Sequence, residues 1–458
     1  MTMGRRLGLL LMLSCIGVSV WWGTAIARRV PGGPLDFQAI YYGSRCLLEH
    51  HNPYNVSELE GVYRAGGWER PSDSTDPTRR LQTVTLCTNL PSTLLLIAPF
   101  AMLPLGVAQV IWMLLTAGVL LLAAFLMWDI GSIYAPILSG FLIGLLLANC
   151  ELVFLTGNTA GIVVSLCMVA AWCFLQERFV IAGVLCMAVS LVIKPHDSGL
   201  VWLFFLLAGG VYRKRALQSL AVTAALALPA ILWVSSVAPH WTQDLSYNLL
   251  VTAVPGGING AGPASIAANI IGCVLSLQTV FAVFRDDPHI YNPLTYLLCG
   301  AMLAAWSVST LRTGFSQAGA WLALATIAPI TMLITYHRSY DAKLLILTVP
   351  ACAMLWANGG TIRWFALGIN TAAFVLTADF PLTILMILAR NLHISTAAII
   401  GQLETVVLMR PAPLILLAMS VFYLWVYTRR TELGARKELE RKVTQELCPQ
   451  VAQTSLSA

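Results

Sequence analysis

Charged residues are scarce in this sequence. Asp, Glu, Lys and Arg make up only 10% of its 458 residues, against about 25% in a typical soluble domain. Hydrophobic residues account for 58% of the chain. A soluble globular domain of this length has no use for so apolar a composition, so that class is excluded. The apolar runs are also far too long for the strands of a membrane barrel. The sequence therefore predicts an all-α, polytopic membrane protein.

Several signatures of enzymes and metal sites are missing. The chain has no Walker loop, no GxGxxG and no Ser-His-Asp elbow, which leaves nucleotide hydrolysis and dinucleotide chemistry without support. None of its eleven cysteines forms a CxxC pair. A disulfide between Cys46 and Cys87 stays an alternative, although their spacing alone does not place the Cα atoms within reach. The adjacent His50 and His51 diverge by about 100° on a helix. The sequence therefore predicts no metal and no other cofactor.

The net charge of +6 does not indicate a nucleic-acid-binding protein, because the basic residues stand at the ends of apolar runs instead of on one face. Membrane topology accounts for them better. We expect cytoplasmic turns at Gln176–Arg178 and Arg213–Arg215. Residues 429–458 form a basic tail, also expected in the cytoplasm. Residues 1–428 form a single transmembrane domain.

Hydropathy predicts about twelve membrane crossings and two large outer loops, at residues 28–89 and 239–292. Two further apolar stretches are expected not to cross: Leu90–Leu103 dips into the bilayer, and Ile266–Phe284 is re-entrant or lies flat. The expected crossings are Leu7–Ala27, Leu105–Trp128, Ile133–Leu152, Ala160–Phe174, Val180–Ile193, Gly199–Val211, Ala216–Ser235, Pro293–Leu311, Ala318–Thr335, Leu344–Trp356, Trp364–Thr377 and Leu414–Tyr427.

The first outer loop begins with the most informative stretch, Pro34–Asn55. Asp36 stands where a helix should begin, and an apolar stripe follows it at three- and four-residue spacing. We expect this helix to lie on the membrane surface, with Asp36 as a catalytic base between water and lipid. The alternative is that Asp36 only caps the helix, which is worth about 1 kcal/mol. The stripe consists of Phe37, Ile40, Tyr41, Leu47 and Leu48.

Two more polar clusters flank apolar helices. Lys194–Asp197 ends a predicted span, and its lysine either binds a phosphate or snorkels to the interface. Tyr336–Lys343 combines aromatic rings with cations, a histidine and a carboxylate, which suits a phosphate and a sugar ring; the alternative is a solvated loop. Counting crossings puts both clusters, together with Gly157–Asn158, on the outer face with Asp36.

The first-loop stretch resembles the first-loop signature of bacterial polyprenol-phosphate-mannose-dependent mannosyltransferases, glycosyltransferase family 87, which have the GT-C membrane fold. Thr156–Gly161, Val192–Asp197 and His337–Asp341 are similar to further blocks of that family. Asn158 and His196 stand where its members usually have glutamine. The residues that match the signature are Asp36, Phe37, Tyr41, Tyr42, Leu47, Leu48, Asn52, Pro53 and Tyr54.

The resemblance implies a GT-C-like bundle in the cell membrane with its active face periplasmic or extracellular. Such an enzyme moves a hexose, in that family mannose, from a polyprenyl-phosphate donor to a lipid or glycan acceptor. Asp36 would act as the base of a single inverting displacement, while Lys194, His337 and Arg338 would bind the donor phosphate. The expected partners include membrane lipids and exclude nucleic acid. The expected substrate-binding residues are Tyr41, Tyr42, Asn158, His196, Tyr340 and Asp341.

Two other functions stay open at this point. A transporter or lipid-linked sugar flippase also carries ionisable residues near membrane helices, although these tend to sit mid-span in related halves, and the chain has no internal repeat. A structural subunit without catalysis would tolerate replacement of Asp36, Lys194 and His337. An assay that compares sugar transfer with translocation separates the glycosyltransferase from the transporter.

Overall fold

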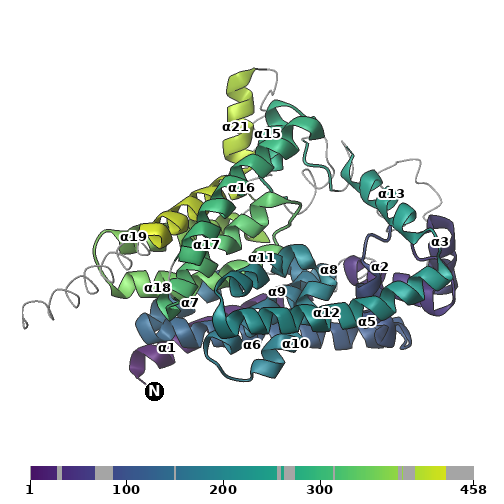
Figure 1. Ribbon diagram of the computed structural model, residues 1–458, viewed down its shortest axis with the longest axis horizontal. Coiled ribbons are helices and arrows are strands. Elements are labelled where there is room, and N and C mark those ends of the chain that lie inside the picture. The colour runs from purple at the N-terminus through teal and green to yellow at the C-terminus, as the bar shows by residue number, and fades with distance from the viewer. Residues whose placement is uncertain are drawn as a thin grey trace, which may run out of the picture.

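A computed structural model of the chain describes residues 2–27, 34–67, 86–148, 151–254, 259–262, 274–312, 315–379, 384 and 398–429. Across these ranges the chain is helical and contains no strand, as the sequence predicted (Figure 1). In chain order the helices are α1 (Met3–Ala27), α2 (Leu35–Leu48), α3 (Val56–Ala65), α5 (Pro91–Ala101), α6 (Leu105–Tyr134), α7 (Pro136–Leu147), α8 (Glu151–Thr156), α9 (Ala160–Leu175), α10 (Val180–Ile193), α11 (Pro195–Leu207), α12 (Gly210–Val237), α13 (Trp241–Ala253), α15 (Gln278–Phe284), α16 (Pro288–Arg312), α17 (Gln317–Ile334), the 3-10 helix η1 (Asp341–Thr348), α18 (Val349–Ala357), α19 (Ile362–Leu376), α21 (Ile399–Met409) and a last helix, Pro411–Arg429.

Six helices in the described ranges are long and apolar enough to cross a membrane, which is the pattern of a helical membrane protein. The other expected crossings fall on helices shorter than the roughly 20 residues that a bilayer core requires, so the count of twelve stays a prediction. Helix α5 has 11 residues and is about 16 Å long, in keeping with a segment that does not cross. The six are Met3–Gly23, Leu105–Tyr134, Gly210–Val237, Pro288–Arg312, Gln317–Ile334 and Pro411–Arg429.

Two of the expected spans are divided or shortened by local backbone chemistry. Helix α6 ends at Tyr134 and α7 begins at Pro136, so Ile133–Leu152 is not one helix. Proline lacks an N–H and disfavours helical backbone in the residue before it, and Ala135 has φ −148°. Gly209 and Gly210 have φ of 75° and 51°, conformations that separate α11 from α12 inside the expected span Gly199–Val211.

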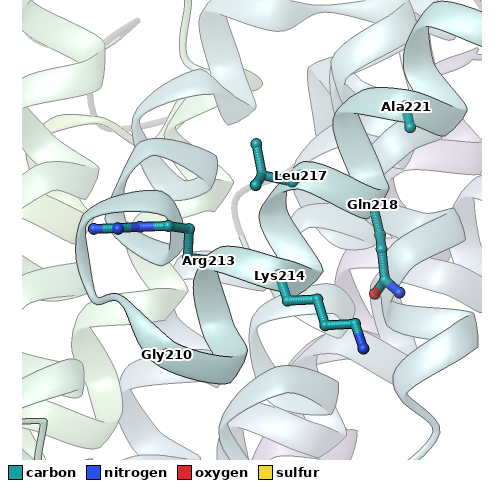
Figure 2. A pocket seen from close by; sticks show the side chains of 6 residues that line it. All are labelled: Gly210, Arg213, Lys214, Leu217, Gln218 and Ala221. Atoms are coloured by element: carbon teal, nitrogen blue, oxygen red, sulfur yellow. The ribbon is translucent and has the colours of Figure 1, made fainter.

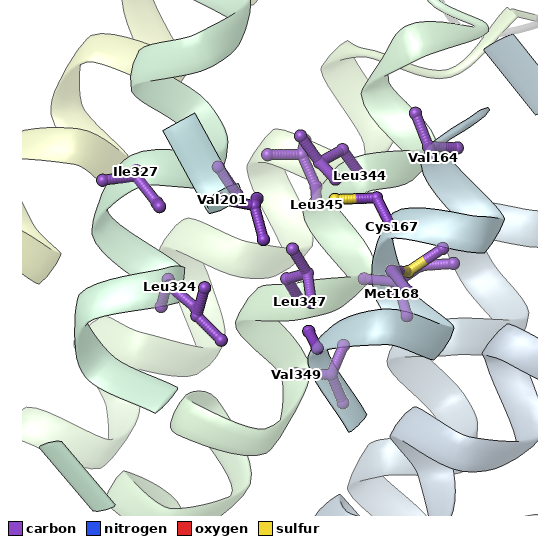
Figure 3. Packing of buried hydrophobic residues seen from close by; sticks show 14 of the residues in the cluster. Val164, Cys167, Met168, Val201, Leu324, Ile327, Leu344, Leu345, Leu347 and Val349 are labelled. Carbon is purple, nitrogen blue, oxygen red and sulfur yellow. The ribbon is translucent and has the colours of Figure 1, made fainter. Parts of the chain in front are cut away.

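The main core lies around η1, which is buried along its whole length. Figure 3 shows Cys167 and Met168 of α9 packed with Leu345 and Leu347 of η1 and with Leu324 of α17, and all five side chains are fully buried. A helix that is apolar on every side is stable only where protein or lipid surrounds it. The expected span Leu344–Trp356 is therefore a central element that begins as a 3-10 helix and continues as α18.

Helices α1 and α7 cross with their backbones in contact. A Cβ on Gly8 would overlap the carbonyl oxygen of Pro136, and a Cβ on Gly140 would overlap that of Gly8. Gly4 and Gly144 continue the two small-residue stripes at four-residue spacing, and a Cβ on Gly144 would lie 3.0 Å from the Cys15 sulfur. Small residues at this spacing let membrane helices approach closely.

Helix α2 packs into a second core. Phe37 and Leu47 are fully buried against side chains that include Leu94 of α5 and Leu59 of α3. The apolar stripe faces protein, and the expectation that this helix lies on the membrane surface stays a prediction. Figure 1 shows α2, α3 and α13 together at one end of the molecule.

Parts of the expected loops lie outside the described residues. In the second loop only α13 and the segments 259–262 and 274–292 are described, so the placement of Ile266–Phe284 is settled only for α15 at its end. The part of the first loop from 68 to 85 and the tail beyond residue 429 also lie outside.

Candidate functional site

Asp36 lies in the first turn of α2. The N-cap of that helix is Pro34, and no side chain caps it, so the interpretation of Asp36 as the capping residue is wrong. The half-buried carboxylate instead accepts a hydrogen bond of 2.7 Å at Oδ2 from Asn158 Nδ2. Asn158 stands in the short turn between α8 and α9, and its Oδ1 accepts a hydrogen bond of 2.9 Å from the Ala160 amide.

The turn that carries Asn158 is fixed against α2. Gly157 has φ +65°, and a Cβ there would lie 2.8 Å from the Phe37 Cβ. Trp112 Nε1 donates a 2.8 Å hydrogen bond to the Gly157 carbonyl, and its ring stacks on that of Phe37 with centroids 5.3 Å apart. A left-handed φ and this close approach both require glycine. These contacts hold Asn158 in position beside Asp36.

The run after α17 is buried, so the solvated-loop interpretation is wrong. His337 and Ser339 are fully buried, and Tyr340 is 5% exposed. Asp341 begins η1, and its Oδ2 accepts a 2.8 Å hydrogen bond from the Arg338 amide. The Leu275 amide donates to the His337 carbonyl at 2.8 Å, which ties the run to the end of the second large loop.

Arg338 and two tyrosines of this run lie within electrostatic reach of Asp36. The guanidinium of Arg338 lies over the Tyr336 ring, 5.4 Å from its centroid. Burial lowers the pKa of Arg338, but the two neighbouring tyrosines and Asp36 together raise it, and the guanidinium stays charged. Burial also raises the pKa of Tyr336 and Tyr340, with Asp36 contributing to both. Asp36 at the start of α2 therefore interacts electrostatically with the run after α17.

Lys194 occupies the break between α10 and α11 and does not snorkel away from the protein. Its Nζ donates a 2.8 Å hydrogen bond to Asp341 Oδ1 and lies 3.6 Å from Asp197 Oδ2. It also lies 5.2 Å from the centroid of the Tyr340 ring. Burial lowers the pKa of Lys194, but the two carboxylates outweigh that effect and the net shift is upward. The ammonium is thus held by internal carboxylates.

The break itself is stabilised from α5. Pro195 cannot donate a hydrogen bond to the preceding turn. Two hydroxyls supply donors to the carbonyls at the end of α10: Ser92 Oγ donates to Val192 at 2.8 Å, and Thr93 Oγ1 donates to Ile193 at 3.2 Å. The main chain that presents Lys194 is therefore anchored to a helix about a hundred residues earlier in the sequence.

Asp197 and His337 form a buried pair that the sequence did not single out. His337 Nε2 lies 3.1 Å from Asp197 Oδ1, and both side chains are fully buried. Burial raises the pKa of Asp197, but Lys194 and the two histidines lower it by more, for a net downward shift. Burial lowers the pKa of His337, whereas Asp197 raises it, for a net upward shift. His196 lies beside this pair, with its ring centroid 5.2 Å from that of His337.

Tyr41 and Tyr42 have structural partners. The Tyr41 hydroxyl donates a 2.7 Å hydrogen bond to the Leu103 carbonyl after α5, and the Tyr42 ring lies 4.1 Å from that of Tyr63 in α3. Both residues are about 5% exposed. Their assignment to substrate binding stays a prediction.

The two large loops contact each other. Asn52 Nδ2 donates a 2.8 Å hydrogen bond to Asp244 Oδ2 in α13. Asn248, which is 1% exposed, donates to the carbonyls of Tyr54 at 3.0 Å and Cys87 at 3.1 Å. Cys46 and Cys87 are both buried free thiols. Among the described residues, polar side chains join the two loops here, without a disulfide between Cys46 and Cys87.

An open surface hollow of about 480 Å³ lies elsewhere, along the first turns of α12 (Figure 2). Every residue that lines it comes from that one helix, and none is a predicted site residue. A hollow built by one helix face has no converging polar groups of the kind that fix a ligand. It therefore carries no argument about function. Its lining residues are Gly210, Arg213, Lys214, Leu217, Gln218 and Ala221.

Comparisons with known proteins identify no relative of the chain. No family model matches it, and no match was found among curated proteins or among solved structures. The described part of the chain defines a class: it is helical, with six candidate membrane-spanning helices and a polar cluster built from segments far apart in sequence. The function has to be argued from that cluster.

Proposed function

We propose that the chain is a membrane glycosyltransferase that moves a hexose from a polyprenyl-phosphate donor to a lipid or glycan acceptor. The hexose is mannose, and the active face is periplasmic or extracellular, if the resemblance of Asp36–Tyr54 to the family 87 mannosyltransferases extends to substrate and topology. The observation that carries the proposal is the position of Asp36 beside Asn158 and within electrostatic reach of Arg338.

Asp36 is the proposed general base. It is partly exposed, and one of its oxygens is fixed by Asn158. The hydroxyl of the acceptor gives its proton to the carboxylate while its oxygen forms a bond to the anomeric carbon. The bond from that carbon to the phosphate oxygen breaks, and polyprenyl phosphate leaves with the electron pair. A single displacement without a covalent enzyme intermediate inverts the anomeric centre.

Arg338 is the proposed principal partner of the donor phosphate. A guanidinium binds phosphate oxygens through two parallel N–H groups, and a preorganised cation stabilises the negative charge that develops on the leaving group. Lys194 and His337 contact Asp341 and Asp197. We assign them to the same phosphate-binding face as Arg338. Tyr336 and Tyr340 would border the sugar.

A transporter or lipid-linked sugar flippase remains the second candidate. The buried network of Lys194, Asp197 and Asp341 favours it, because ionisable groups buried in a membrane protein often mark a transport path. A structural subunit is the third candidate, and it predicts that replacing Asp36 has no functional effect.

The first experiment incubates the purified protein in detergent with polyprenyl-phosphate mannose and lipid or glycan acceptors, and identifies products by mass. We expect transfer by the native chain and a loss of at least about 100-fold in Asp36→Asn, since a general base contributes about 10²–10⁴-fold. The thermal unfolding midpoint of Asp36→Asn should stay unchanged, because an Asn side chain still accepts the hydrogen bond from Asn158.

Asp244→Asn is the matched control. It removes a carboxylate from α13 but keeps an acceptor for Asn52, and it should retain full transfer. Near-normal turnover by Asp36→Asn would remove Asp36 from the mechanism. Translocation of the lipid-linked sugar in vesicles, with no transferred product, would establish the flippase instead.

A further inference from the structure

His196, Asp197 and His337 bring three metal-ligating atoms together. The two histidine nitrogens and one carboxylate oxygen all lie within 4.8 Å of one another. Asp197 Oδ1 is 3.1 Å from His337 Nε2 and 3.8 Å from His196 Nε2. Ligand atoms of a tetrahedral Zn²⁺ site, with bonds of about 2.0–2.2 Å, lie about 3.3–3.6 Å apart. The 3.1 Å separation lies just below this range, and the 3.8 Å separation lies just above it.

Two of the three atoms that would ligate the metal, those of Asp197 and His337, lack hydrogen bonds of their own. Within the described part of the chain, neither Asp197 oxygen nor His337 Nε2 makes a hydrogen bond of acceptable geometry. Both side chains are fully buried, and a buried polar group left unsatisfied costs about 1–3 kcal/mol. Lys194 approaches the other oxygen, Oδ2, at 3.6 Å. Oδ1 is therefore the oxygen directed at the two imidazoles.

The other ring nitrogen of His337, Nδ1, has the kind of hydrogen-bond partner that metal-ligating histidines have. Nδ1 lies 3.0 Å from the carbonyl of Thr335, and a carbonyl can only accept. Nδ1 therefore carries the proton and Nε2 is directed at Asp197. Histidines that ligate metals almost always donate their other N–H in this way, which fixes the tautomer and the ring. The His196 side chain is 41% exposed and gives an ion access from the surface.

We infer that His196, Asp197 and His337 bind one divalent transition-metal ion of the Zn²⁺ type, with at least one coordination position left open. Two imidazoles and a carboxylate are the ligand set of catalytic zinc sites and of related divalent ions. The ion replaces any proton on His337 Nε2. The inference goes beyond the proposed glycosyl transfer: it gives His337 a metal ion to bind in place of the donor phosphate, and it stands without that transfer.

The test measures metal binding by the full-length protein in detergent, free of any polyhistidine tag. After chelator treatment and its removal, Co²⁺ is titrated and the visible absorption of tetrahedral Co²⁺ is followed; Zn²⁺ content is measured by mass spectrometry after Zn²⁺ loading. We expect one equivalent of either ion. His196→Ala should weaken binding by at least about 100-fold, since even the loss of an outer-shell partner costs about 10–100-fold.

His289→Ala is the matched control, because His289 is an exposed histidine in the first turn of α16, and it should bind as the native chain does. His196 is partly exposed, so its replacement should leave the fold intact, which the thermal unfolding midpoint verifies. The Asp197→Asn variant tests the role of the carboxylate, and its Co²⁺ binding is followed by the same visible absorption. The inference fails if the native chain binds no Co²⁺, leaving a simple ion pair, or if His196→Ala binds it unchanged.

Discussion

Asn158 uses both ends of its side-chain amide. Its Nδ2 donates to Asp36 Oδ2, and its Oδ1 accepts from the Ala160 amide at the start of α9. One residue therefore closes the turn before α9 and orients the proposed base. Glutamine, with one more methylene, could not keep both distances in the same short turn without a shift of α9.

Replacing Asn158 should damage transfer more than stability. Asn158→Ala loses the hydrogen bond from the Ala160 amide, worth about 0.5–1.5 kcal/mol. It also loses a hydrogen bond to a charged group, worth about 1.5–3 kcal/mol, so transfer should slow about 10- to 100-fold. Thermal unfolding and the transfer assay measure the two effects. Asn55→Ala is the control, because Asn55 caps α3 through the Ser57 and Glu58 amides and should lose stability but keep full transfer.

The residues of the site were partly visible in the sequence. Asp36, Lys194 and His337 stand in polar runs between apolar ones, so their positions at helix ends could be predicted. Asp197 stands in one of those runs but had no assigned role, because its fully buried partner His337 comes from the run after α17 and is brought there only by tertiary packing. The internal ion pairs of Lys194 were missed for the same reason.

Among the elements, the crossing of α1 and α7 depends on the absence of side chains. Gly8 and Gly140 bring the two backbones into contact.

The apolar runs predicted where most helices lie, but not where they end. The ends depend on single residues such as Pro136 and on the glycine pair at Gly209–Gly210, whose effects hydropathy does not register.

Gly8→Leu should destabilise the protein strongly. A side chain at this position overlaps the main chain of α7, whereas overpacking against movable side chains costs only about 1–3 kcal/mol. We expect a lower thermal unfolding midpoint and a lower yield of monodisperse protein. Gly17→Leu serves as the comparison, since a Cβ on Gly17 of the same helix has nothing within 4 Å. Equal behaviour of the two variants would show that the crossing is not tightly packed.

For the whole molecule, the two large loops form one end, joined by Asn52 to Asp244 and by Asn248 to two carbonyls. Counting the predicted spans places both loops on the same side of the membrane. The contact between the two loops agrees with that placement. The face itself stays a prediction. The number of spans could not be fixed from hydropathy because α9, α10, α18 and α19 are apolar yet short.

Thiol labelling tests the predicted orientation. Glu49→Cys places a thiol at the exposed end of α2, and Lys214→Cys places one near the start of α12. In sealed, right-side-out vesicles an impermeant maleimide should label the first variant, and the second only after permeabilisation. The unsubstituted chain is the background, since its described cysteines are buried or partly buried. Labelling of both variants from the outside would overturn the topology.

Ser92 and Thr93 have a consequence for assembly. Both hydroxyls precede the carbonyls they serve by a hundred residues, and synthesis runs from the N-terminus. Unsatisfied carbonyls are costly in lipid. Because the donors leave the ribosome first, they are already present when the discontinuity before Pro195 emerges, whereas Asp341, which accepts the hydrogen bond of Lys194, follows 147 residues after that lysine.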